Sequence, residues 1–200
     1  MAKEIQAAGG KAFIVQADIS KVEEAKRLIE DVVSKNKRLD ILVNNAAVVE
    51  AMPLEAMTPE HVEKIFGTNL YGPLWVPQEA AKHPPKGGRV ISVGSPASKA
   101  RFPKFPAYSA AKGALDVFTK IWSTELREKG VNVNSANPGA VETDMSADLR
   151  RDIEAGRISK EAIGRIGAPS NIADIVAFLA SPDAEWINGE SIFADAGFTL

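Results

Sequence analysis

Residues 89–93 read Arg89-Val90-Ile91-Ser92-Val93, a short run rich in β-branched residues that shows no regular alternation of apolar and polar positions. Other short apolar runs occur along the chain, and longer segments with helical periodicity separate them. A strand with one face in water alternates apolar and polar residues, whereas a strand that is covered on both faces does not. The pattern therefore predicts an α/β fold, in which a parallel sheet carries helices on both faces.

The expected elements follow from the same patterns. The predicted strands cover residues 12–15, 41–43, 89–93, 131–133 and 191–193, and the predicted helices cover residues 2–8 and begin near Ser20, Thr58, Tyr108 and Ser170. Ser20 and Glu23 have the spacing of a capping box, and Thr58-Pro59 supplies a cap followed by a proline in the first turn. Pro77 falls inside the helix that begins at Thr58, so we expect that helix to break near Val76.

The composition excludes several classes of function. The 200 residues carry a net charge of −2 and include no cysteine, so disulfides, thiol catalysis and cysteine-ligated metals are excluded, and nothing favours nucleic acid as a partner. The two histidines, His61 and His83, lack a ligand spacing, so we expect no metal site. No apolar run approaches the ~20 residues of a membrane span, and residues 1–10 contain no hydrophobic signal core. We expect a single domain over residues 1–200 in a cytoplasmic protein that binds no membrane.

Tyr108 and Lys112 are four residues apart in a predicted helix, so their side chains lie one turn from each other on the same face. A tyrosine phenol titrates near pH ~10, and a neighbouring ammonium lowers its pKa toward the range where proton transfer is useful. The pair alone also fits an ordinary helix surface. Ligands of parallel α/β sheets bind beyond the carboxyl ends of the strands. Residues of suitable chemistry follow the predicted strands there: Asp18, Asn44, Ser95 and Asn137-Pro138-Gly139.

Five segments in order along the chain resemble the motifs of the short-chain dehydrogenase/reductase family. They are Asn44-Asn45-Ala46-Ala47, Asn69 within Gly67-Thr68-Asn69-Leu70, Ser95 thirteen positions before Tyr108, Pro138-Gly139 followed by Thr143, and Asp195-Ala196-Gly197. Each segment alone is a weak signal, but five at the family spacing are specific. The resemblance covers essentially the whole chain and implies a three-layer, Rossmann-like fold. Residues 88–95 also resemble fungal polyketide-tailoring reductases, which suggests a role in secondary metabolism.

The resemblance also implies a role for each site residue. Tyr108 would exchange a proton with the substrate oxygen, and Lys112 would lower the tyrosine pKa and bind the nicotinamide ribose. Ser95 would hydrogen-bond the substrate oxygen, and Asn69 would hold a water linked to the lysine. The family positions that touch the dinucleotide correspond to Asp18, Asn44, Ala46, Val141 and Thr143. For these five a purely structural role, as in turns and strand ends, is an equal alternative. Residues 145–168 correspond to the variable substrate lid.

The sequence departs from the family pattern on its N-terminal side. It contains no Gly-x-x-x-Gly-x-Gly motif, and we interpret it as truncated, without the first strand, glycine-rich turn, first helix and second strand of the family. That turn lets the backbone approach the cofactor diphosphate. We therefore expect a truncated sheet of about five strands, in which residues 12–15 either pair with residues 41–43 or leave them as an open edge. A second subunit would cover such an edge, so we expect a homodimer or a larger assembly.

Three functions remain open. The preferred hypothesis is a non-redox enzyme with no cofactor, in which Tyr108, Lys112 and Ser95 isomerise, dehydrate, epimerise or cyclise a polyketide-like ketone or alcohol. It rests on the difficulty of holding a nicotinamide within ~3.5 Å of the reacting carbon without a diphosphate anchor. The second hypothesis is an NADP(H)- or NAD(H)-dependent carbonyl reductase or alcohol dehydrogenase whose cofactor site is completed by a neighbouring subunit, by a rearranged loop or in a longer natural chain. The third is a non-catalytic remnant of the family.

Overall fold

The computed structural model describes residues 1–83, 87–156 and 165–197 of the chain. Its centre is a four-stranded parallel sheet with the strand order β1-β2-β3-β4. The strands are β1 (Ile41–Asn44), β2 (Arg89–Val93), β3 (Asn132–Pro138) and β4 (Ser191–Ala194). All pairs are parallel, and β3 pairs with β2 through residues 132–136 and with β4 through residues 135–138, so that all four carboxyl ends lie at one edge of the sheet.

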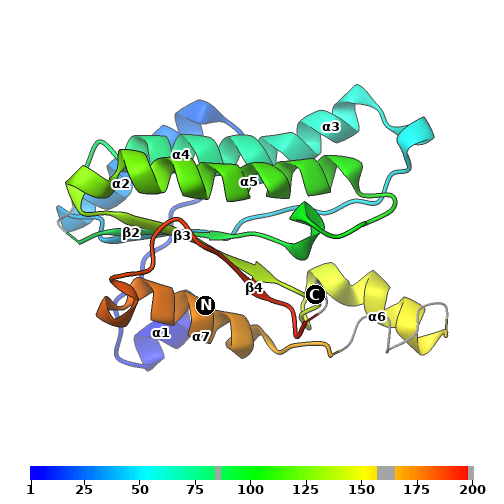
Figure 1. The fold of residues 1–200 in the computed structure, drawn as a ribbon. Coiled ribbons are helices and arrows are strands. Elements are labelled where there is room, and N and C mark those ends of the chain that lie inside the picture. Colours follow the sequence, from blue (N-terminus) through cyan, green and yellow to red (C-terminus); the bar gives the residue numbers. More distant parts are fainter. Residues whose placement is uncertain (84–86, 157–164, 198–200) are drawn as a thin grey trace.

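Helices cover both faces of this sheet, as Figure 1 shows. On one face lie α2 (Val22–Asn36), α3 (Pro59–Phe66), α4 (Gly72–Ala80) and α5 (Pro106–Glu125). On the other lie α1 (Ala2–Ala7), α6 (Ala147–Glu154) and α7 (Pro169–Ala180). Short 3₁₀ turns cover residues 54–56, 96–98, 127–129, 144–146 and 182–184. The arrangement confirms the predicted three-layer α/β fold.

Side chains of the central strands alternate between two buried cores. Val90 and Val133 pack beneath α5, where they meet Trp122. Ile91 and its neighbours on the opposite face pack against α7 around Leu179. Both faces of β2 are therefore buried, which explains why its sequence shows no polar alternation.

The predicted strand at residues 12–15 is not part of the sheet, so the sheet has four strands and not about five. The segment has no regular secondary structure, and side chains bond two carbonyl oxygens at its ends: Gln6 Nε2 donates to Ala12 O at 3.0 Å, and Arg27 Nη2 donates to Gln16 O at 2.8 Å. A strand requires a neighbouring strand to bond its backbone groups, and an apolar run cannot specify that neighbour.

β1 pairs with β2 on one side only, so it forms an edge of the described sheet. Its side chains Ile41 and Val43 are 46% and 40% exposed, and Ile14 of the extended segment is 81% exposed. This matches the second of the two predicted arrangements, in which the strand at residues 41–43 is left open. Coverage of this edge by another subunit stays a prediction. None of the helices in the described ranges is long and apolar enough to cross a membrane.

The helix around Pro77 differs from the prediction. A π-helical turn over residues 67–71 leads into α4, and α4 continues through Pro77 to Ala80 without a break at Val76. Proline inside a helix costs ~3 kcal/mol because its nitrogen carries no hydrogen. Val76, Pro77 and Ala80 are all buried, and α4 packs closely against α2. Burial of each large apolar side chain contributes roughly 1.5–3 kcal/mol, which offsets the cost of the proline.

Candidate active site

The carboxyl edge of the sheet brings together three of the four residues that the sequence assigned to catalysis. Ser95 follows the end of β2 and caps the turn at residues 96–98, where its Oγ accepts a hydrogen bond from Ala97 N at 3.2 Å. Helix α5 begins at Pro106, and its first turns present Tyr108 and Lys112 to the same edge. The Ser95 hydroxyl lies close enough to the Tyr108 phenol to act on its pKa.

Lys112 is a buried cation, with only 3% of its surface exposed. Its Nζ donates to the carbonyl oxygen of Val93, the last residue of β2, at 2.8 Å. No Asp or Glu oxygen of the described residues forms an ion pair with it within 4.0 Å. Burial without a counter-charge lowers the pKa of Lys112 to about 8. An ammonium has three N–H donors, so this group retains capacity to bind a further acceptor.

Tyr108 behaves differently from the sequence expectation. Burial raises the pKa of its phenol above the usual value, and the hydrogen bond with Ser95 only partly opposes that rise. The Lys112 ammonium lies 5.7 Å from the centre of the tyrosine ring and donates to Val93 instead of to the phenol. The raised pKa of Tyr108 is opposite in direction to the predicted lowering by Lys112, because burial is the largest cause of the shift. The phenol carries its proton at neutral pH, which suits a proton donor.

Asn69 is fully buried in the π-helical turn before α4. Its Oδ1 accepts from Val48 N at 2.9 Å, and its Nδ2 donates to Val48 O at 2.7 Å. The amide thus fixes the chain that follows β1. A π-turn often marks a functional position in a helix, because it displaces one residue out of the regular spacing. The predicted role of Asn69 in holding a water stays a prediction.

Three of the predicted cofactor residues, Asn44, Val141 and Thr143, have local structural contacts, and a fourth, Ala46, is exposed. Asn44 ends β1, with its Nδ2 3.5 Å from Ser92 Oγ, and Ala46 is exposed just beyond it. Val141 forms a parallel bridge with Gly167. Thr143 caps the turn at residues 144–146, where its backbone nitrogen donates to Ser146 Oγ at 3.2 Å. All four lie on the segments that follow the strand ends, as the sequence predicts. Of the predicted lid, residues 157–164 lie outside the described part.

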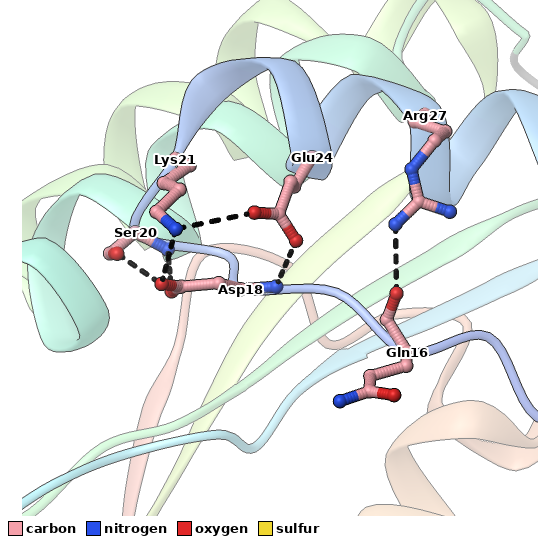
Figure 2. A network of polar contacts seen from close by, with 6 residues as sticks. All are labelled: Gln16, Asp18, Ser20, Lys21, Glu24 and Arg27. Atoms are coloured by element: carbon pink, nitrogen blue, oxygen red, sulfur yellow. Dashed lines mark hydrogen bonds and ion pairs between the residues drawn. The ribbon is translucent and has the colours of Figure 1, made fainter.

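Asp18 belongs to an exposed network at the start of α2 (Figure 2). Its Oδ1 accepts from Ser20 Oγ at 2.6 Å and from Ser20 N at 3.1 Å, and its Oδ2 lies 3.6 Å from Lys21 Nζ. Its own backbone nitrogen donates to Glu24 Oε2 at 2.8 Å. The two hydrogen bonds from Ser20 are the main cause of the lowered pKa of Asp18. This geometry favours the structural alternative for Asp18, a turn that starts the helix.

The same network corrects the predicted cap of α2. Ser20 does not bond the nitrogen of Glu23; its hydroxyl donates to Asp18, and Lys21 occupies the cap position of a helix that begins at Val22. A serine caps a helix when its Oγ accepts from a backbone N–H of the first turn, but here the hydroxyl is oriented toward Asp18 and donates to its carboxylate. By contrast, Thr58 caps α3 as predicted, because its Oγ1 accepts from His61 N at 3.2 Å.

The site fits the nicotinamide half of a dinucleotide cofactor. The unused donors of the buried Lys112 suit ribose hydroxyls, which would accept hydrogen bonds in a place that excludes water. The turn after β3 is held close to the end of β4, since a Cβ on Gly139 would lie 2.7 Å from Asp195 Cα. The 200 residues contain no glycine-rich motif of the kind that binds a diphosphate. Within the described part, no three His, Cys, Asp or Glu side chains form a metal site.

Sequence reasoning did not single out Asp116. This residue lies one helical turn beyond Lys112, just as Lys112 lies one turn beyond Tyr108. Its carboxylate accepts hydrogen bonds from side chains of two strands, at the face of the sheet that supports the site. The signal was present in the spacing, because residues at i, i+4 and i+8 share a helix face.

Comparison with known proteins shows what this chain is similar to. Residues 1–199 match the family model described as Enoyl-(Acyl carrier protein) reductase. The chain is 41% identical over 196 residues to a protein of Methylorubrum extorquens named as an oxidoreductase, covering 96% of this chain and 79% of that protein. It is 34% identical over 200 residues to elsinochrome reductase 1 of Elsinoe fawcettii, covering 94% of this chain and 75% of that protein.

A solved structure gives the same result for the fold. The structure of the angucycline C-6 ketoreductase LanV with bound NADP superposes with a TM-score of 0.91 and 33% identity, covering all of this chain and 80% of LanV. These similarities correct the preferred hypothesis. A non-redox enzyme without a cofactor is wrong, because the relatives are named as an oxidoreductase and a reductase and a neighbour of the same fold holds NADP. The hypothesis took the lack of one motif in this sequence as the loss of the whole cofactor site.

Proposed function

Because this chain belongs to the short-chain dehydrogenase/reductase family, we propose that it is an oxidoreductase that interconverts a small-molecule ketone and alcohol with NADP(H). The observation that carries this proposal is the buried ammonium of Lys112, one helical turn from Tyr108, with the Ser95 hydroxyl near the phenol. Names of relatives support the reaction class, and NADP in the LanV structure supports the cofactor.

The bound nicotinamide would supply the hydride, and the residues of this chain would handle the proton. As the carbonyl oxygen gains negative charge, Tyr108 donates its phenolic proton to it. Ser95 hydrogen-bonds the same oxygen and fixes its position. The Lys112 cation then stabilises the phenolate that remains, because an opposite charge nearby favours the ionised form. Positioned acid–base groups of this kind contribute roughly 10²–10⁴-fold in rate.

The substrate class that we propose is an aromatic, polyketide-like ketone. The segment between Ser95 and Tyr108 carries Phe102, 37% exposed, and the segment beyond Thr143 carries Met145, 47% exposed. Apolar side chains on the loops that flank a polar centre suit an apolar, planar substrate. The names of the reductase of Elsinoe fawcettii and of LanV refer to elsinochrome and to an angucycline ketone, which supports a small-molecule ketone as the substrate.

A binding titration tests the cofactor part of the proposal. NADPH is titrated into the 200-residue protein, and the nicotinamide fluorescence is followed together with consumption of NADPH in the presence of 1-tetralone. We expect saturable binding, weakened in Lys112→Met and unchanged in Lys120→Met, a lysine exposed on the same helix. Binding that is absent, or that is equal in both variants, would overturn the proposal.

A further inference from the structure

The end of β2, which leads directly into Ser95, is held from two sides. Lys112 Nζ donates to Val93 O at 2.8 Å on one side. On the other side the amide of Asn137 packs against Gly94 so closely that a Cβ on this glycine would lie 2.7 Å from Asn137 Cγ. The position of Ser95 therefore depends on where the Asn137 amide lies.

Asn137 is itself held by a chain of hydrogen bonds. Its Oδ1 accepts from Ser135 Oγ at 2.7 Å, and its Nδ2 donates to Asp116 Oδ1 at 3.1 Å. The same carboxylate oxygen accepts from Ser191 Oγ at 2.7 Å, so α5, β3 and β4 meet at Asp116. Asn137 and Ser135 are both fully buried, so no water replaces a lost partner there.

Asp116 does not act as the counter-charge of Lys112. No ion pair within 4.0 Å joins the two side chains in the described structure, and the pKa of Lys112 is lowered by burial alone. The carboxylate accepts instead from the strand side chains Asn137 and Ser191. Its effect on the site must therefore pass through Asn137.

We infer that Asp116 is a positioning residue of this enzyme: it orients the Asn137 amide, which fixes Gly94 and so holds Ser95 against Tyr108. The inference rests on the proposed function, since that function assigns Ser95 and Tyr108 their catalytic roles. Without Asp116 the buried amide has an unpaired donor and turns, and the Gly94–Ser95 backbone moves into the space that it leaves. Displacements of about 1 Å in a catalytic group cost roughly 10²-fold in rate.

A spectroscopic test reads the contact between Ser95 and the Tyr108 phenol without any cofactor. The chain has two tyrosines, so in a Tyr71→Phe background the protein labelled with ¹³Cζ-tyrosine gives one resonance, that of Tyr108. Ser95→Ala defines the shift that accompanies loss of the serine hydroxyl beside the phenol. We expect Asp116→Ala to move the resonance in the same direction, and Val117→Ala, at an exposed position of α5, to leave it in place. An unmoved resonance in Asp116→Ala would overturn the inference.

The second test exchanges the carboxylate and the amide between positions 116 and 137. It can be done even if the Asp116→Ala variant does not fold. Asn137→Asp places a carboxylate against Asp116, and we expect it to lower kcat roughly 10–100-fold with the KM for NADPH unchanged. The double variant Asp116→Asn, Asn137→Asp restores one amide and one carboxylate. We expect its kcat to lie within about threefold of wild type, so that most of the roughly 10–100-fold loss in Asn137→Asp is recovered. Failure of the double variant to recover would refute positioning by this pair. If wild type itself oxidises no NADPH, the proposed function fails, and the tyrosine resonance still decides the role of Asp116.

Discussion

Replacement of Lys112 by methionine should change how the free energy of unfolding depends on pH. The burial of the ammonium determines the sign and size of this change. The pKa of Lys112 falls from the usual 10.5 to about 8 in the folded protein because the side chain is buried without a counter-charge. The folded protein therefore binds this proton less tightly than the unfolded chain does. Stability rises with pH wherever the unfolded state holds more protons, which for this group means from about pH 8 toward 10.5. The difference between the two pKa values corresponds to a gain of roughly 3 kcal/mol in the free energy of unfolding.

The assay is urea unfolding of wild type and Lys112→Met at pH 7, 8, 9 and 10, with the free energy of unfolding compared between the two proteins. Methionine matches the aliphatic length of lysine and carries no charge. We expect the wild type to gain about 2–3 kcal/mol relative to the variant between pH 7 and pH 10. The variant also loses the hydrogen bond to Val93, a cost of about 1–3 kcal/mol that does not change with pH. If the free energies of unfolding of the two proteins changed in parallel with pH, the claim that the ammonium is buried without a counter-charge would be refuted.

Three further predictions test other parts of the structure. Tyr108→Phe removes the proton donor and should lower kcat roughly 10²–10⁴-fold with the Kd for NADPH unchanged, measured by steady-state kinetics and fluorescence titration; equal kcat would show that another group donates the proton. Gly94→Ala should destabilise the protein by about 1–3 kcal/mol in thermal unfolding because its Cβ meets the Asn137 amide, whereas Gly113→Ala, with open space around its Cβ, should stabilise α5 by up to about 1 kcal/mol. Paired lysines at Ile41 and Val43 should reduce the mass found by sedimentation if a second subunit covers the β1 edge; an unchanged mass would place any interface elsewhere.

Much of the sheet could be predicted because a strand buried on both faces lacks the regular alternation of apolar and polar residues. The run at residues 89–93 places β-branched residues on both faces and matches β2 residue for residue. Residues 12–15 carry a similar run but form no strand, because strand formation depends on a partner that lies elsewhere in the chain. Pro77 was expected to end its helix, but the packing of α4 on α2 outweighs the local cost.

The site residues could be located from spacing, whereas their electrostatics could not. Tyr108 and Lys112 were placed correctly on one helix face. The direction of the tyrosine pKa was not predictable, since it depends on burial and on Lys112 bonding Val93 instead of the phenol. Asp116 was missed because its importance comes from Asn137 and Ser191, which reach it from two distant strands.

The central claim is that this chain transfers a hydride and does not merely move protons. The most direct measurement incubates the protein with 1-tetralone and NADPH deuterated at C4 of the nicotinamide, and the alcohol product is examined by mass spectrometry. We predict one deuterium at the carbinol carbon of the product, with one NADPH consumed for each alcohol formed. A parallel reaction contains 1-tetralone in D₂O and no NADPH. The claim would be contradicted if deuterium entered the carbon beside the carbonyl there and neither reaction formed the alcohol.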